Sequence, residues 1–240
     1  MLESGTARVP RSASEIRAVL FDLDGTLVDT VALILASMRH ATHTVLGYTP
    51  PDEVLMQGVG VPLATQMHAF SVEHAEELVR TYRAHNWEIH DELIAEYPGA
   101  EDVLGELAAR GMPMGVVTSK SRSVATRGIE RFELQRYLRV VVCADDTTRH
   151  KPEPDPLVRA AGLLGVPLDE CAYVGDSPYD MQAALAGGAI AVAALWGAFA
   201  PHAVLGPRPH FALRFLGDIL PLLDGEEQRF RIGSDAVPPL

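Results

Sequence analysis

Lysine is nearly absent from this sequence. The chain has 240 residues, and of its 20 basic residues only Lys120 and Lys151 are lysines. Acidic residues number 32, which gives a formal net charge of −12. Proteins that bind nucleic acid hold its phosphates with clustered basic side chains, so this charge balance argues against that class. Genomic codon bias is the simplest explanation of the preference for arginine, and the informative feature is where the two lysines remain.

Cysteine is also scarce, and a secretory signal is missing. Cys143 and Cys171 each lie in an apolar run, and two cysteines do not make a disulfide framework, so we expect buried free thiols. Residues 1–17 carry scattered charges without an apolar signal core. Residues 181–207 are uncharged and long enough to span a bilayer, but glycines and Pro201 interrupt them. We interpret them as a helix, a turn and a buried strand of a cytoplasmic protein without a membrane partner.

Short apolar runs recur along the chain, and they are typical of strands buried on both faces of a sheet. The runs are Arg17–Asp22, Met114–Thr118, Val140–Ala144, Cys171–Gly175 and Ala189–Leu195. Helical patterns such as Glu101–Arg110 and Asp155–Leu164 lie between them, each followed by a glycine that ends the helix. This alternation predicts an α/β fold with a doubly wound parallel sheet covered by helices on both faces.

One long segment departs from this alternation. Residues 30–97 show helical periodicity without a convincing strand, and Pro98 and Gly99 close the segment. We therefore predict an inserted all-helical domain over 30–97 and an α/β core formed by 16–29 and 98–223. The polar ends, 1–15 and 224–240, are expected to be a flexible tail and a weakly ordered tail.

Polar side chains gather where the predicted strands end, at the sheet edge where parallel α/β proteins bind ligands. They are Asp22, Asp24, Thr118, Ser119, Lys120, Lys151, Asp176 and Asp180. Carboxylates at close range repel one another, and a hard divalent cation with oxygen ligands, above all Mg²⁺, relieves that repulsion. Zinc is a poor match because no cysteine or paired histidine is near. Mg²⁺ beside lysine and hydroxyl groups suits a phosphoryl group.

Four segments in order resemble the motifs of the haloacid dehalogenase (HAD) superfamily of hydrolases. They are FDLDGTLVDT (21–30), VVTSK (116–120), HKPEPDP (150–156) and VGDSPYD (174–180). The resemblance covers Arg17 to about Leu223, and the inserted segment is similar to the helical cap of the phosphoglycolate phosphatase-like branch. It implies a HAD-like Rossmannoid core with a cap that closes over a small substrate.

The resemblance also implies a role for each catalytic residue. Asp22 is the nucleophile that attacks phosphorus and forms an aspartyl-phosphate. Asp24 is the general acid for the leaving oxygen and then the general base for water. Lys151 neutralises Asp22 and the transferring group.

The same resemblance assigns the metal and phosphate ligands. Mg²⁺ would be held by the Asp22 carboxylate, the Asp24 main-chain carbonyl and Asp176, with Asp180 supporting the site. The Thr118 hydroxyl and the Ser119 amide would bind phosphoryl oxygens.

Several features narrow the reaction. Asp24 disfavours carbon–halogen hydrolysis, whose enzymes lack an acid at this position. Residues 30–97 contain no lysine, which argues against phosphonate cleavage through a Schiff base. The apolar turn at 58–62 disfavours a sugar-phosphate mutase, which usually brings basic groups from the cap.

We therefore expect a Mg²⁺-dependent phosphatase for a small metabolite of the phosphoglycolate type. The alternative is an inorganic pyrophosphatase, because residues 81–99 resemble the cap segment of that group. A β-phosphoglucomutase-like mutase and a catalytically idle binding module are less favoured. Arg83 and His90 are candidates to reach substrate oxygens, although packing of the cap helix also explains them. Lys120 has no assigned task, and the oligomeric state stays open.

Overall fold

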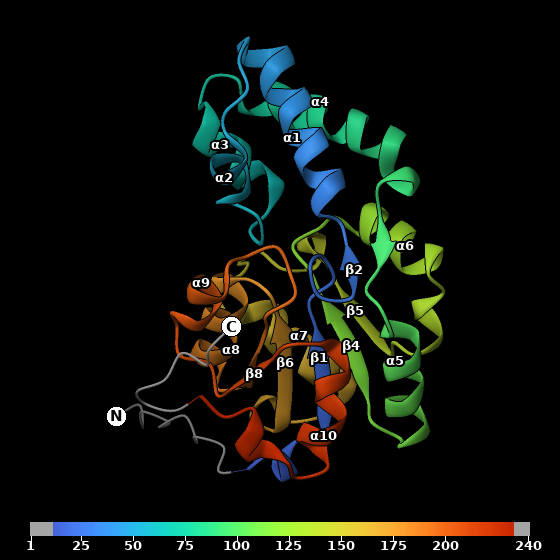
Figure 1. Ribbon diagram of the computed structural model, residues 1–240. Coiled ribbons are helices and arrows are strands. Elements are labelled where there is room, and N and C mark those ends of the chain that lie inside the picture. The colour runs from blue at the N-terminus through green and yellow to red at the C-terminus, as the bar shows by residue number, and fades with distance from the viewer. Residues whose placement is uncertain (1–11, 233–240) are drawn as a thin grey trace.

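The computed structural model describes residues 12–232, which form an α/β core with a helical domain above it (Figure 1). The core contains one six-stranded sheet in the order β5-β4-β1-β6-β7-β8, and every neighbouring pair is parallel. The strands are β1 (Ala18–Phe21), β4 (Met114–Val117), β5 (Val140–Val142), β6 (Cys171–Gly175), β7 (Ile190–Ala194) and β8 (Phe211–Leu213). The predicted doubly wound parallel sheet is confirmed.

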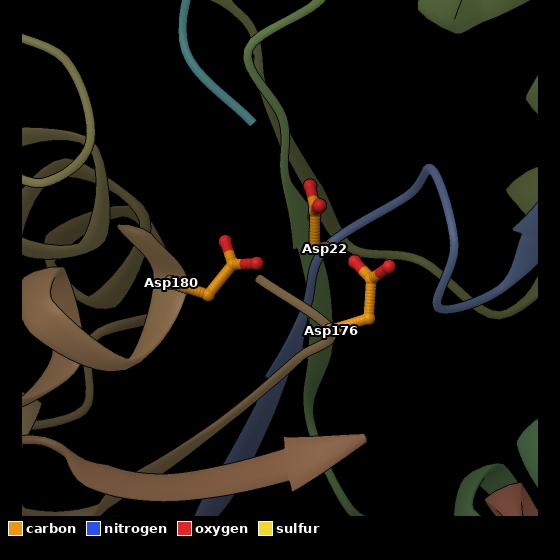
Figure 2. A group of neighbouring side chains, drawn as sticks. All are labelled: Asp22, Asp176 and Asp180. Atoms are coloured by element: carbon orange, nitrogen blue, oxygen red, sulfur yellow. The ribbon is translucent and has the colours of Figure 1, made fainter. Parts of the chain in front are cut away.

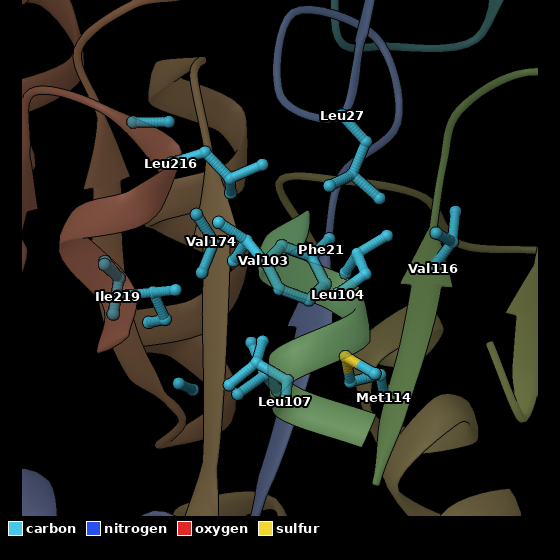
Figure 3. Close-up of a cluster of buried hydrophobic side chains, with 14 of the residues drawn as sticks. Phe21, Leu27, Val103, Leu104, Leu107, Met114, Val116, Val174, Leu216 and Ile219 are labelled. Atoms are coloured by element: carbon cyan, nitrogen blue, oxygen red, sulfur yellow. The ribbon is translucent and has the colours of Figure 1, made fainter. Parts of the chain in front are cut away.

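Helices cover both faces of this sheet. On one face lie α5 (Ala100–Ala109), α6 (Arg122–Arg131) and α10 (Ile219–Leu223), whose apolar side chains join Phe21 and Val174 in one core cluster (Figure 3). On the other face lie α7 (Asp155–Leu164), α8 (Pro178–Gly187) and α9 (Pro201–Leu205), packed against Leu20 and Tyr173. Burial on both faces is the reason that the strands read as continuous apolar runs.

The five predicted strands are present, with ends within two residues of the predicted ones. The sixth strand, β8, was not predicted because it is only the three residues Phe-Ala-Leu at the edge of the sheet. Such a short apolar run does not stand out from helix or loop by periodicity.

The helical domain comprises α1 (Val31–Leu46), α2 (Asp52–Met56), α3 (Leu63–Phe70) and α4 (Ala75–Ile89), with a small core of its own. Two short strands join it to the α/β core. β2 (Val28–Asp29) pairs antiparallel with β3 (Ala95–Glu96), so the two connections between the domains run side by side. The segment 30–97 therefore contains a strand that was not predicted, because a two-residue strand shows no alternation.

The two ends of the described chain pack against each other. Ala13–Glu15 and Glu227–Arg229 form 3-10 helices, and the Ala13 N–H donates to Glu227 Oε2 at 2.5 Å. Ala13 and Phe230 are buried, which gives both polar segments an apolar anchor. Residues 12–15 and 224–232 thus differ from the expected loose tails, and 1–11 and 233–240 lie outside the described residues.

Cys143 and Cys171 are buried free thiols, as predicted. The uncharged stretch 181–207 runs through part of α8, then β7 and α9. Among residues 12–232, no helix combines the length and the apolar character needed to cross a membrane.

We predict that Leu104→Ala destabilises the core far more than Leu163→Ala. Leu104 on α5 is completely buried, so truncation leaves a cavity and costs about 2–5 kcal/mol of unfolding free energy. Leu163 on α7 is 59% exposed, and its truncation should cost less than about 0.5 kcal/mol. Urea unfolding followed by circular dichroism measures both, and equal losses would contradict this packing.

Candidate active site

The order of the strands brings three predicted acids to one place. Asp22 follows β1 and Asp176 follows β6, and these two strands are neighbours in the sheet. Asp180 lies in the first turn of α8. Figure 2 shows the three carboxylates side by side, and one oxygen from each lies within 4.8 Å of the others. All three side chains are buried.

Two close backbone approaches form a slot for the Asp176 carboxylate. Gly25 has a φ of +76°, and a Cβ there would lie 2.1 Å from Asp176 Oδ2. A Cβ on Gly197 would lie 2.3 Å from the same oxygen. The Ala198 N–H donates to Asp176 Oδ2 at 2.7 Å. Glycine at 25 is therefore required both by the turn and by the carboxylate opposite.

Lys151 is buried between two carboxylates. Its Nζ lies 3.0 Å from Asp22 Oδ1 and 2.7 Å from Asp180 Oδ1. Burial alone would lower the pKa of this ammonium, but the charges of Asp180 and Asp22 outweigh burial and raise it above its ordinary value. Lys151 is therefore charged at neutral pH.

Asp180 is held by partners within the protein. Its Oδ2 accepts from the Ser177 N–H at 3.0 Å and from Ser177 Oγ at 2.6 Å. Its Oδ1 accepts from Lys151 and lies 2.9 Å from Tyr173 Oη. Asp180 thus holds Lys151 in place, and its supporting role at the metal site stays a prediction.

Tyr173 is a site residue that the sequence analysis missed. Lys151 Nζ donates to its hydroxyl at 3.1 Å, and that hydroxyl also lies 3.1 Å from the Val117 carbonyl oxygen. The available signal was a buried tyrosine within the otherwise aliphatic run of β6, because a buried tyrosine hydroxyl requires a partner.

The acids at this edge carry more negative charge than the described residues neutralise. Burial raises the pKa of Asp22 to about 7, with Lys151 lowering it and Asp180 and Asp24 raising it. Burial, Asp180 and Asp22 raise the pKa of Asp176 well above its usual range. Asp22 Oδ1 pairs with Lys151 by charge but receives no aligned hydrogen bond among residues 12–232.

A divalent cation fits this arrangement. The donors are carboxylate oxygens at close range, which is the ligand set of a hard cation such as Mg²⁺. The carboxylates of Asp22 and Asp176 accept fewer hydrogen bonds from neighbouring side chains than the carboxylate of Asp180 does. The Asp24 main-chain carbonyl stays a predicted ligand.

Lys120, which had no assigned task, forms an ion pair with Asp24. Its Nζ contacts Asp24 Oδ1, and Thr30 Oγ1 donates to the same oxygen at 2.6 Å. Thr30 is the residue that precedes α1 of the helical domain. Asp24 is therefore oriented by one contact from the core and one from the start of the helical domain.

A cavity of about 160 Å³ lies between the core and the helical domain. Most of the predicted site residues line it, namely Asp22, Asp24, Thr118, Ser119, Lys151 and Asp176, together with Lys120. Two hydrogen bonds join the core to the helical domain: Ser119 Oγ donates to the carbonyl oxygen of Gly60, another lining residue, at 2.6 Å, and Tyr179 Oη donates to that of Gln57 at 3.2 Å.

Arg83 and His90, the two candidates on the helical domain for contacting substrate, differ in their position relative to the cavity. Arg83 lines the cavity, whereas His90 is not part of its lining. His90 is buried, and its Nδ1 lies 2.7 Å from Asp91 Oδ1. His90 has a packing role in this structure.

The sequence profile of the haloacid dehalogenase-like hydrolase family matches residues 19–194. The chain belongs to this family. It is 37% identical over 211 residues to a Caldanaerobacter subterraneus protein with a provisional pyrophosphatase assignment under the name PpaX, covering 88% of this chain and 96% of that one. It is 34% identical to the pyrophosphatase PpaX of Bacillus cereus, covering 87% and 97%.

Solved structures share the fold over most of the chain. A hydrolase from Pseudomonas syringae superposes with a TM-score of 0.78 at 26% identity, covering 87% of this chain and 98% of that one. A Lactobacillus plantarum protein with a provisional assignment as a phosphoglycolate phosphatase also gives 0.78, at 25% identity and 86% and 99% coverage. These likenesses include the helical domain, which we call the cap from here on.

We predict that Gly25→Ala lowers the affinity for Mg²⁺ about 10- to 100-fold, because the new methyl group displaces Asp176 from its slot. Gly47→Ala is the matched control. It has nearly the same φ, +77°, with nothing within 4 Å of the added carbon, so it carries only the backbone strain of about 1–2 kcal/mol. Calorimetric titration with Mg²⁺ measures both affinities. Equal affinities in the two folded variants would rule out this role of Gly25.

Proposed function

We propose that this protein is a Mg²⁺-dependent phosphohydrolase that transfers a phosphoryl group from a small substrate to Asp22 and then to water. One observation carries the proposal. A buried carboxylate, Asp22, faces a cavity and pairs with a buried ammonium, Lys151, while its Oδ1 receives no aligned hydrogen bond among the described residues. Such an oxygen is desolvated, charge-compensated and available, as a nucleophile requires.

In the first step, the Asp22 carboxylate attacks phosphorus and the bond to the leaving oxygen breaks. Lys151 reduces the repulsion between the carboxylate and the anionic phosphoryl group, because its charge lies 3.0 Å from Asp22 Oδ1. Asp24 gives a proton from Oδ2 to the leaving oxygen, because Lys120 and Thr30 both contact Oδ1 and hold the carboxyl group in place.

In the second step, Asp24 takes a proton from a water molecule that attacks the phosphorus of the aspartyl-phosphate. Inorganic phosphate leaves, and Asp22 is regenerated. Thr118 lines the same cavity, where its hydroxyl can donate to a phosphoryl oxygen. Mg²⁺ held by Asp22 and Asp176 would neutralise charge on the phosphoryl oxygens.

Two substrates are candidates. The curated relatives named pyrophosphatase match at 34–37% identity over nearly their whole length, and this supports pyrophosphate. The structural neighbour with a phosphoglycolate phosphatase assignment matches at 25% and supports the monoester predicted from the motifs. The motifs predicted phosphoglycolate first; we propose to test pyrophosphate ahead of it, because the relatives that carry the pyrophosphatase name have the higher identity.

We predict that Asp22→Asn lowers kcat by about 10⁴-fold or more, because it removes the nucleophile. The exposed residue Asp102, in the first turn of α5, gives the control Asp102→Asn, which should retain full activity. Phosphate release from pyrophosphate, phosphoglycolate and p-nitrophenyl phosphate is measured with Mg²⁺ and with a chelator. Near-wild-type turnover by Asp22→Asn, or turnover that survives chelation, would contradict the mechanism.

The same assay ranks the substrates by kcat/KM. Pyrophosphate is expected to be best and phosphoglycolate second, with hexose phosphates far behind. A preference for hexose phosphates would instead support the hypothesis that the protein is a sugar-phosphate mutase. A wild-type protein that binds these compounds but converts none would be the idle binding module.

A further inference from the structure

Three basic side chains line the cavity, and they differ in what they contact. Lys151 is paired with Asp22 and Asp180, and Lys120 is paired with Asp24. Arg83, the third, makes no hydrogen bond or ion pair within residues 12–232. The two lysine charges are thus committed to catalytic-site carboxylates, and the guanidinium of Arg83 is available to a ligand.

Arg83 belongs to the face that α4 turns toward the cavity. Tyr82, its neighbour, and Asn86, three residues further along the helix, line the same cavity and are buried. Residues three apart lie on one side of a helix. Arg83 itself is exposed, so its side chain lies at the cavity and not inside the cap core.

The cap side of the cavity is otherwise mostly apolar. Residues 59–64 supply two valines, a proline, a leucine and an alanine to the lining. An arginine beside such a surface favours anionic ligands. Its guanidinium offers a bound anion a planar pair of N–H donors in place of water. Arg83 is the one basic side chain that the described cap contributes to the lining.

We infer that Arg83 determines specificity by binding a second anionic group of the substrate, while the core binds the phosphoryl group that is transferred. The substrate class is therefore a small phosphate compound with a second anionic group close to the first, either a carboxylate or a second phosphate. This inference rests on the proposed function, because the catalytic acids and lysines fix the reacting end at the core. It excludes phosphate esters whose other end is neutral as good substrates.

The alternative is that Arg83 only solvates the surface of α4. The same helix offers a matched control, because Arg80 lies three residues earlier, is exposed and does not line the cavity. Arg80→Gln removes the same charge from the same helix at a position that does not line the cavity.

The experiment compares paired substrates in the Mg²⁺-loaded enzyme. Phosphoglycolate is paired with 2-hydroxyethyl phosphate, in which a hydroxymethyl group replaces the carboxylate, and pyrophosphate is paired with methyl phosphate. Arg83→Gln is expected to lower kcat/KM about 10- to 100-fold for the better of the two substrates that carry two anionic groups, as loss of a charge-assisted hydrogen bond does. For the neutral-ended partner the change should stay below about threefold, and Arg80→Gln should change neither.

Binding gives a second readout that does not depend on turnover. Phosphoglycolate, 2-hydroxyethyl phosphate, pyrophosphate and methyl phosphate are titrated into the Mg²⁺-loaded Asp22→Asn protein with and without Arg83→Gln. A loss of affinity confined to the compounds with two anionic groups supports the inference. Equal losses for all four, or none, overturn it. Failure of the wild-type enzyme to hydrolyse any of them refutes the proposed function, while the binding ratios still decide the role of Arg83.

Discussion

The whole site depends on one buried ion pair network, in which the Lys151 ammonium lies between Asp22 and Asp180. Lys151 is 2% exposed, and a charge removed from water to this extent is tolerated only when partners compensate it. Asp180 is in turn fixed by Ser177, and Tyr173 completes the contacts around the ammonium. Removing one partner of such a network leaves an unpaired buried charge, which typically costs about 3–5 kcal/mol. In the proposed mechanism, the same ammonium compensates the charge of Asp22 as it attacks phosphorus.

The proposed function divides chemistry and substrate selection between the two parts of the molecule. The core supplies the acids and lysines from strand ends, where neighbouring strands fix their relative positions. The cap supplies the opposite wall from α4 and the loop near Gly60. Its contacts with the core include the hydrogen bond from Ser119 to Gly60. In the proposed function, the reaction takes place at the core and the cap selects the substrate, with Arg83 as the distinguishing group.

The position of the site could be predicted because it follows from the parallel sheet. Acids directly after apolar runs meet at one edge, so Asp22 and Asp176 were found from the sequence alone, and the structure brings them together. The sequence could not predict that Lys120 pairs with Asp24. The two residues are 96 positions apart, and a loop conformation brings their side chains together. The role of Tyr173 could not be predicted for a similar reason, since Lys151, which contacts its hydroxyl group, lies in a separate loop.

Prediction of the fold likewise succeeded for the long regular elements and failed for the short ones. Periodicity identified the long elements, but it contains no information on strands of two or three residues such as β2, β3 and β8. The contact between Ala13 and Glu227 escaped prediction because the two segments are polar in composition and 214 residues apart. Only the folded chain brings them together.

The central claim is that the phosphoryl group passes through a covalent intermediate on Asp22. The configuration at phosphorus tests it most directly, with an isotopically chiral thiophosphoryl substrate hydrolysed in labelled water. Each in-line displacement inverts phosphorus. Two successive displacements, first by Asp22 and then by water, predict net retention. Net inversion would show a single direct attack by water and would contradict the account.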